Sequence, residues 1–208
     1  MTAGVMDLLR EDGALALPRL ASIPDPLPLL HALAAGGIRV VEFAFTTPRV
    51  TALIEAGSEV AGVRVGAGTV TTAAQARDAI AAGASFLVTP GVVDEVAAIA
   101  GAHDVPVVMG ALTPTEALAA VRLGAAAVKI FPAETVGAAY FRHLSGPFPD
   151  MPLVASGGLH DGNAAEYRRA GALAVTAGSS VVSAADVAAN DWERVSARAR
   201  AFVVAARG

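Results

Sequence analysis

The sequence predicts an α/β fold, a single-domain (β/α)8 TIM barrel that spans residues 1–208. Short apolar runs alternate with Ala-rich segments of helical character about every twenty to twenty-five residues. Eight such pairs occur, and no Pro/Ser-rich linker or run of charges separates them. Hydrophobic residues make up 54% of the chain and charged residues only 16%, which is enough apolar sequence for a large buried core.

The expected strands are near-continuous apolar runs, which is typical of parallel strands covered on both faces. They are Ala14–Pro18, Val40–Phe45, Arg64–Ala67, Phe86–Val88, Pro106–Met109, Ala127–Ile130, Pro152–Ala155 and Ala174–Ala177. The expected helices are Pro28–Ala35, Pro48–Ala56, Ala73–Ala82, Asp94–Ala100, Pro114–Arg122, Ala138–Leu144, Gly162–Ala170 and Trp192–Ala206. Thr113, Pro114 and Glu116 supply an N-cap, an N1 proline and an early acid, the marks of a helix start. An open doubly wound sheet is the alternative arrangement.

The composition excludes several classes of function. The net charge is −4 and the arginines are scattered, so we expect no binding to nucleic acid or to a membrane surface. There is no cysteine, which excludes disulfides, zinc–thiolate sites and thiolate nucleophiles, and the four histidines are isolated from one another, so we expect no metal site. Residues 1–7 lack the basic and apolar regions of a signal peptide, and no apolar stretch is long enough to span a membrane, so we expect a cytoplasmic protein.

Lys129 is the single lysine among 15 basic residues, and it lies in the most apolar of the expected strands. Its place near the C-terminal end of that strand is where barrel enzymes assemble their active sites. A guanidinium stays protonated, whereas a desolvated lysine ammonium loses its proton more readily, and the neutral amine can attack a ketone to form an imine. We therefore predict that Lys129 is a nucleophile. The alternative is a structural lysine that extends from the barrel rim to solvent.

Eight short motifs, each weak alone, follow one another along the chain. They are Gly36-Gly37-Ile38, Val41-Glu42-Phe43, Val65–Val70, Thr89-Pro90-Gly91, Gly110–Glu116, Lys129–Glu134, Ser156-Gly157-Gly158 and Ala177-Gly178-Ser179. In this order, from about Leu15 to Val182, the sequence resembles the 2-keto-3-deoxy-6-phosphogluconate (KDPG) aldolase family, which includes the 4-hydroxy-2-oxoglutarate (KHG) aldolases. The resemblance implies a class I aldolase that needs no metal or other cofactor.

The resemblance also implies roles for individual residues. Lys129 corresponds to the Schiff-base lysine, and Glu42, expected at the end of the second strand, to the general acid/base. For Glu42, the alternative is an ion pair with a nearby arginine. Thr69 corresponds to a residue that holds the keto-acid end of the substrate, and Phe131 would pack against the imine. Arg19 would face the same site or form a surface salt bridge.

Glycines after the seventh and eighth expected strands predict a phosphate site, because backbone N–H groups of these loops commonly bind phosphate in barrels. The remaining substrate-binding residues predicted in this way or by the resemblance are Pro90, Ser156, Gly157, Gly158, Gly178 and Ser179. Two departures from the family pattern leave the exact sugar acid open. Thr46 stands where some relatives have an arginine, and Ala155-Ser156 stands where the family usually has Pro-Thr.

The resemblance implies cleavage of KDPG to pyruvate and glyceraldehyde 3-phosphate, with 4-hydroxy-2-oxoglutarate, which gives pyruvate and glyoxylate, as a further candidate substrate. It also implies a homotrimer and a place in the Entner–Doudoroff pathway. Three alternatives stay open: a 2-keto-3-deoxy-6-phosphogalactonate aldolase, a phosphate-binding barrel isomerase or epimerase, and a non-catalytic sugar-phosphate sensor.

Overall fold

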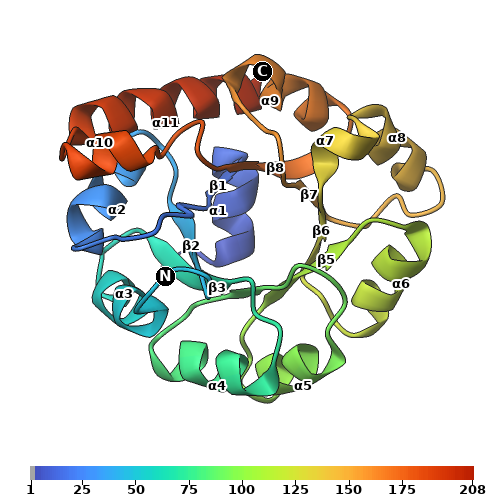
Figure 1. Cartoon of the computed structure of the whole chain (residues 1–208). Helices are drawn as coiled ribbons and strands as arrows, with labels where there is room; N and C mark the ends of the chain where they lie inside the picture. Colours follow the sequence, from blue (N-terminus) through green and yellow to red (C-terminus); the bar gives the residue numbers. More distant parts are fainter. Residues whose placement is uncertain (1–2) are drawn as a thin grey trace.

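The computed structural model describes residues 3–208, so the first two residues of the N-terminal segment considered for a signal peptide lie outside it. The chain forms a closed barrel of eight parallel strands in chain order, ringed by helices (Figure 1). The strands are β1 Ala14–Ala16, β2 Val40–Ala44, β3 Arg64–Gly68, β4 Leu87–Val88, β5 Val107–Ala111, β6 Ala127–Ile130, β7 Leu153–Ala155 and β8 Ala172–Ala177. The predicted barrel is confirmed, and the open sheet is wrong because β1 pairs with β8 as well as with β2.

Eight helices coincide with predicted ones. They are α2 Pro26–Ala35, α3 Val50–Ser58, α4 Ala73–Ala81, α5 Asp94–Ala102, α6 Pro114–Arg122, α8 Ala139–Ser145, α9 Asp161–Arg169 and α11 Trp192–Arg207. The N-terminus of α6 has the capping box that Thr113 and Glu116 suggested. Three further helices were not predicted: α1 Val5–Asp12, α7 Ala133–Val136 and α10 Ala184–Ala188. Within residues 3–208, no helix is long and apolar enough to cross a membrane.

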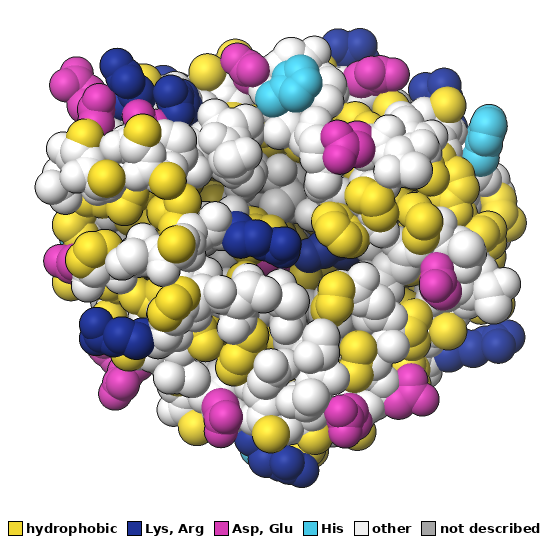
Figure 2. All heavy atoms as spheres, in the orientation of Figure 1, with side chains coloured by type: hydrophobic (Ala, Val, Ile, Leu, Met, Phe, Trp, Pro, Cys, Tyr) yellow, Lys and Arg dark blue, Asp and Glu magenta, His cyan; other side chains and the backbone are white. Residues whose placement is uncertain are grey.

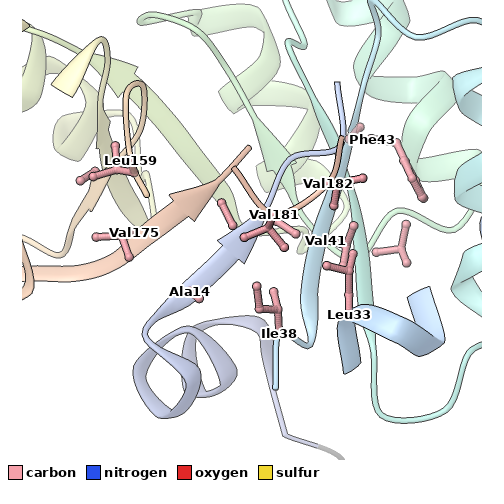
Figure 3. Packing of buried hydrophobic residues seen from close by; sticks show 14 of the residues in the cluster. Ala14, Leu33, Ile38, Val41, Phe43, Leu159, Val175, Val181 and Val182 are labelled. Atoms are coloured by element: carbon pink, nitrogen blue, oxygen red, sulfur yellow. The ribbon is translucent and has the colours of Figure 1, made fainter. Parts of the chain in front are cut away.

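The strands separate two apolar cores. Toward the helices, Val41 and Phe43 of β2 lie on the same side as Leu33 of α2 and the nearby Ile38 (Figure 3). Inside the barrel, a second cluster joins the inward residues of the strands to apolar side chains of α1. Its buried members are Val5, Leu8, Leu9, Leu15, Val40, Phe86, Val88, Val108, Ala127, Val154 and Ala174. Helix α1 therefore closes one end of the barrel, and Figure 1 shows it in the middle of the ring.

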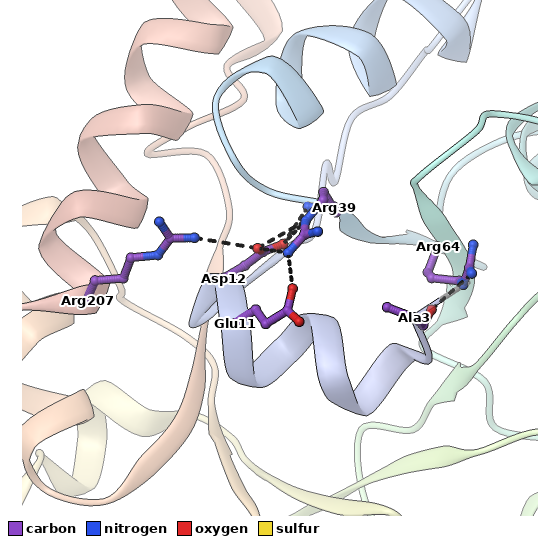
Figure 4. Close-up of polar contacts among 6 residues, drawn as sticks. All are labelled: Ala3, Glu11, Asp12, Arg39, Arg64 and Arg207. Atoms are coloured by element: carbon purple, nitrogen blue, oxygen red, sulfur yellow. Dashed lines mark hydrogen bonds and ion pairs between the residues drawn. The ribbon is translucent and has the colours of Figure 1, made fainter. Parts of the chain in front are cut away.

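Ion pairs hold α1 at the end of the barrel where the strands begin (Figure 4). Arg39, just before β2, donates hydrogen bonds to the buried Asp12 at 2.5 and 3.1 Å and to Glu11 at 2.8 Å, and these partners raise the pKa of Arg39. Arg64, the first residue of β3, donates to the carbonyl oxygen of Ala3 at 2.9 Å. Because both ends of α1 are fixed at this mouth, a ligand can enter the barrel interior only through the opposite one, at the carboxyl ends of the strands.

Close packing between backbone segments explains the glycine at position 110 in β5. A Cβ built on Gly110 would lie 2.2 Å from the carbonyl carbon of Pro90, a backbone atom with little freedom to move. Gly101 in α5 differs, since a Cβ added there would meet no atom within 4 Å.

We predict that Gly110→Ala lowers the free energy of unfolding by roughly 1–3 kcal/mol, the usual cost of overpacking. Gly101→Ala is the matched control and should raise it by up to about 1 kcal/mol, the difference in helix propensity. Urea denaturation of the two variants measures both effects. An unchanged midpoint for Gly110→Ala would contradict the close approach of Pro90.

Candidate active site

A lysine and a glutamate from opposite sides of the barrel meet in its interior. Lys129 is the third residue of β6 and Glu42 is the third residue of β2. The distance between Lys129 Nζ and Glu42 Oε1 is 3.6 Å, and the two side chains are only 5% and 0% exposed. The alternative of a lysine that extends to solvent is therefore wrong. The ion-pair partner of Glu42 is Lys129 rather than an arginine.

The expected place of Glu42 at the end of its strand needs a correction, since two residues of β2 follow it. Its carboxylate has room because Gly68 of β3, which pairs in register with Ala44 two residues further along β2, has no side chain. A Cβ on Gly68 would lie 2.9 Å from Glu42 Oε2 and 3.0 Å from its Cδ. The glycines of the Val65–Val70 motif thus leave space for a buried acid inside the barrel.

Burial controls the protonation of Glu42. Neither carboxylate oxygen has a hydrogen-bond partner among the described residues. Loss of solvation raises the pKa of Glu42, and the positive charges of Lys129 and Arg19 offset part of that rise. The carboxyl group therefore retains a proton at a higher pH than a free glutamic acid does.

A cavity of about 740 Å³ opens at the carboxyl ends of the strands. Lys129 and Glu42 are not among the residues that line it, but Phe131, whose ring lies near Lys129 Nζ, is. Figure 2 shows the hollow at the centre of this face, with Lys or Arg side chains crossing it. Seven of the predicted substrate-binding residues line the cavity: Arg19, Phe131, Ser156, Gly157, Gly158, Gly178 and Ser179. The Phe131 side chain is 38% exposed, and its ring centroid lies 5.8 Å from Lys129 Nζ. The structure thus brings most of the predicted set together.

Thr69 and Pro90 are not among the residues that line this cavity. Thr69 directly follows β3 and Gly68, with φ of 56°, a left-handed backbone conformation that is uncommon for threonine. Pro90 packs on Gly110, which pairs in register with Lys129. The Thr89 hydroxyl fixes this contact by accepting from Gly110 N at 3.1 Å and donating to the carbonyl oxygen of Gly91 at 2.6 Å.

The loops after β7 and β8 line the cavity with residues whose backbone N–H groups have no acceptor among the described residues. No acceptor within residues 3–208 is bonded to the backbone N–H of Gly157, Gly158, Gly178 or Ser179. Gly157 and Gly158 have φ of 98° and 74°, so a left-handed backbone requires glycine at both positions. Gly178 is different, since its φ lies outside that region and a Cβ there would meet no atom within 4 Å. A side chain added at Gly178 would therefore point into open space.

Sequence reasoning gave no role to Thr176, Leu17 or Glu134, which also line the cavity. Glu134 lies against Gly158, where an added Cβ would be 2.2 Å from its Oε2. Alternation along β8 was the signal that could have identified Thr176, because it follows the inward Ala174 by two residues. His160, which also lines the cavity, caps α9: its ring accepts a hydrogen bond from Gly162 N.

Comparison with known proteins identifies the family. A model of the KDPG and KHG aldolase family matches residues 5–198. The 2-dehydro-3-deoxy-phosphogluconate aldolase of Treponema pallidum is 37% identical over 195 residues, which cover 93% of each chain. The chain belongs to the KDPG and KHG aldolase family. It is an aldolase, and aldolases are carbon–carbon lyases.

Solved structures of aldolases superpose on this chain. A KDPG aldolase from Legionella pneumophila, with pyruvate captured as a covalent carbinolamine intermediate, matches with a TM-score of 0.88 and 27% identity over 97% of this chain and 99% of that one. The native KDPGal structure matches with a TM-score of 0.87 and 30% identity over 93% of this chain and 94% of that one. The barrel and the family resemblance expected from the sequence are thus confirmed.

The buried pair generates a prediction about stability and pH. In Lys129→Met, Glu42 keeps its burial but loses its nearest positive charge, so its pKa rises further above the unfolded value. Between those two pKa values the folded chain holds a proton that the unfolded chain lacks, so stability must fall as pH rises. We expect a loss of roughly 3–5 kcal/mol at neutral pH, the usual cost of removing one partner of a buried pair.

Urea denaturation from about pH 5 to about pH 8 measures this effect. The matched control is the double variant Lys129→Met/Glu42→Gln, which has no buried carboxyl group to titrate and should lack the added pH dependence. The same pH slope in the single and double variants would contradict an uncompensated charge at Glu42.

Proposed function

We propose that this aldolase cleaves KDPG to pyruvate and glyceraldehyde 3-phosphate through a Schiff base at Lys129. The observation that carries the proposal is the approach of the Lys129 amine to 3.6 Å from the Glu42 carboxylate inside the barrel. An amine beside a carboxyl group that exchanges protons is the minimum set for imine chemistry. The Legionella pneumophila relative, captured with pyruvate as a carbinolamine, supports the same bond for this chain.

The proposed reaction begins with attack of Lys129 Nζ on the C2 ketone of the substrate. The carbinolamine loses water, and the positively charged imine nitrogen becomes an electron sink. When the C4 hydroxyl loses its proton, the C3–C4 bond breaks, the aldehyde leaves, and the electron pair of that bond forms an enamine. Protonation of the enamine at C3 and hydrolysis of the imine then release pyruvate and return the free amine.

Glu42 is the proposed acid and base for these steps. Its two oxygens have no partner among the described residues, so both are free to accept a proton. The pKa raised by burial lets the carboxyl group protonate the carbinolamine oxygen and the charged form recover a proton afterwards. Phe131, 5.8 Å from the amine, would limit access of water to the imine.

The free N–H groups of Gly157, Gly158, Gly178 and Ser179 support a site for the phosphate of the substrate. Such groups bind phosphate in the corresponding loops of many barrels. Arg19 lines the cavity, and its positive charge offsets part of the rise in the pKa of Glu42, so its guanidinium is the first proposed partner of the substrate carboxylate. Thr69, at the end of β3, is the second proposed partner of that carboxylate.

Two related substrates compete with KDPG in this proposal. The native KDPGal structure matches this chain with a TM-score of 0.87, close to the 0.88 of the Legionella pneumophila KDPG aldolase, so the C4 epimer of KDPG is a second candidate. The unphosphorylated 4-hydroxy-2-oxoglutarate is the other, because the matching family covers KHG aldolases. Cleavage rates with the three substrates decide among them.

The first functional prediction concerns Lys129. Incubation with pyruvate followed by borohydride reduction should add one reduced pyruvate unit to the mass of the wild-type chain. Lys129→Arg should give no internal adduct and no cleavage, since a guanidinium cannot form the imine. Peptide mapping locates the adduct. An unmodified mass, or an adduct that persists in Lys129→Arg away from the N-terminal amine, would refute the mechanism.

The second functional prediction concerns Glu42. Glu42→Gln has nearly the same shape but cannot exchange protons, so turnover should fall roughly 10²–10⁴-fold, the usual contribution of general acid–base catalysis. Binding of pyruvate, followed by ligand-detected NMR, should change little. Turnover close to that of the wild type would show that the buried carboxylate is only structural.

The third functional prediction concerns phosphate. Gly178→Val should raise KM for KDPG and leave KM for 4-hydroxy-2-oxoglutarate nearly unchanged, because the added side chain meets only open space and any bound phosphate. Gly178 is preferable to Gly158 for this test, since a side chain at Gly158 would also strain the backbone and collide with Glu134. An equal effect on both substrates would contradict a phosphate site at these loops.

A further inference from the structure

A buried hydroxyl group without a partner belongs to a residue that lines the active-site cavity. Thr176 in β8 is 4% exposed, and its Oγ1 forms no hydrogen bond with any described residue. The same residue lines the cavity beside Ser156 and Gly178. A buried hydroxyl without a partner destabilises a folded chain, and a valine of the same shape would avoid that cost. The hydroxyl group is therefore explained best by a ligand that fills the cavity.

Alternation along the strands places Thr176 in the same layer as the reacting pair. Val40, Ala127 and Ala174 belong to the apolar cluster inside the barrel. Glu42, Lys129 and Thr176 each follow one of them by two residues, so all three side chains point inward in the next layer toward the carboxyl ends. They come from β2, β6 and β8, and alternate strands supply the side chains of one layer in such barrels.

The position of Thr176 indicates which part of a substrate it can reach. It lies two residues before Gly178, whose free N–H belongs to the proposed phosphate site. A substrate with C2 on Lys129 and its phosphate at the glycine loops must place its C4 and C5 hydroxyl groups between them. The C4 hydroxyl gives up its proton during cleavage and must face Glu42, on β2. The C5 hydroxyl group is then the one left to face β8, where Thr176 lies.

We propose that Thr176 determines specificity by a hydrogen bond between its Oγ1 and the C5 hydroxyl group of the bound sugar acid. This inference rests on the proposed function, since it takes Lys129 as the point of attachment. The proposed hydrogen bond would recognise the part of the substrate that leaves as the aldehyde. A site built to bond a substrate hydroxyl discriminates against the analogue that lacks it, because its own polar group is then left unpaired.

The test measures cleavage of KDPG and of its 5-deoxy analogue, by pyruvate release, in wild type, Thr176→Val and Thr176→Ser. Thr176→Val should lower kcat/KM for KDPG roughly tenfold, as expected for one lost hydrogen bond, and leave the analogue within about twofold. Thr176→Ser keeps the hydroxyl group and should retain the preference for KDPG over the analogue. Equal losses for both substrates in Thr176→Val, or no loss for either, would overturn the assignment.

Two controls separate this inference from other causes. Thermal unfolding of Thr176→Val should show a midpoint no lower than that of the wild type, because the hydroxyl has no partner among the described residues of the folded chain. A lower midpoint would assign Thr176 a structural role and overturn the proposal. Pyruvate trapping by borohydride should be unchanged in Thr176→Val. Failure of trapping in the wild type itself would refute the Schiff base, and the Thr176 contact with it, whereas normal trapping with unselective cleavage refutes the contact alone.

Discussion

The burial of Glu42 against Lys129 inside an otherwise apolar barrel is the constraint on which the rest of the site depends. A charge removed from water is costly unless it is paired, and this carboxylate has one lysine at 3.6 Å and no hydrogen-bond donor in the part of the chain that the structure describes. The described residues thus provide no hydrogen bond to the Glu42 carboxylate and only one ion pair, that with Lys129. A substrate that reacts with the amine and exchanges protons with the carboxyl group uses both of the groups that folding leaves unsatisfied.

The surrounding fold makes that arrangement possible in three ways. Helix α1 fills the mouth at the start of the strands, and Arg39 and Asp12 hold it there, so the lower interior remains apolar. Gly68 leaves the space that the Glu42 carboxylate occupies. At the other mouth, the loops after β7 and β8 keep their N–H groups free and face the cavity with little side chain. The packing and ion pairs that stabilise the barrel thus lie at the start of the strands, and the polar groups without partners lie toward their carboxyl ends.

Much of the barrel, and the place of Lys129 within one of its strands, could be predicted because the signals are local. An apolar run bounded by glycine pairs marks each of several strands, and a single lysine within such a run is conspicuous. The depth of Glu42 could not be predicted from the motif, because it depends on where β2 ends relative to β3 and on the space above Gly68. Helix α1 was missed because its apolar residues pack against the barrel interior, a surface that exists only once the strands have closed into a barrel. Thr176 was missed because a threonine in a strand is ordinary until its unpaired hydroxyl group and the cavity beside it are seen together.

The most direct test of the central claim is a crystal structure of the wild-type enzyme soaked with pyruvate. The account predicts continuous electron density from Lys129 Nζ to C2 of pyruvate, with the Glu42 carboxylate beside the new bond and Phe131 over it. Pyruvate bound without a covalent link, or attached to a group other than Lys129, would contradict the account.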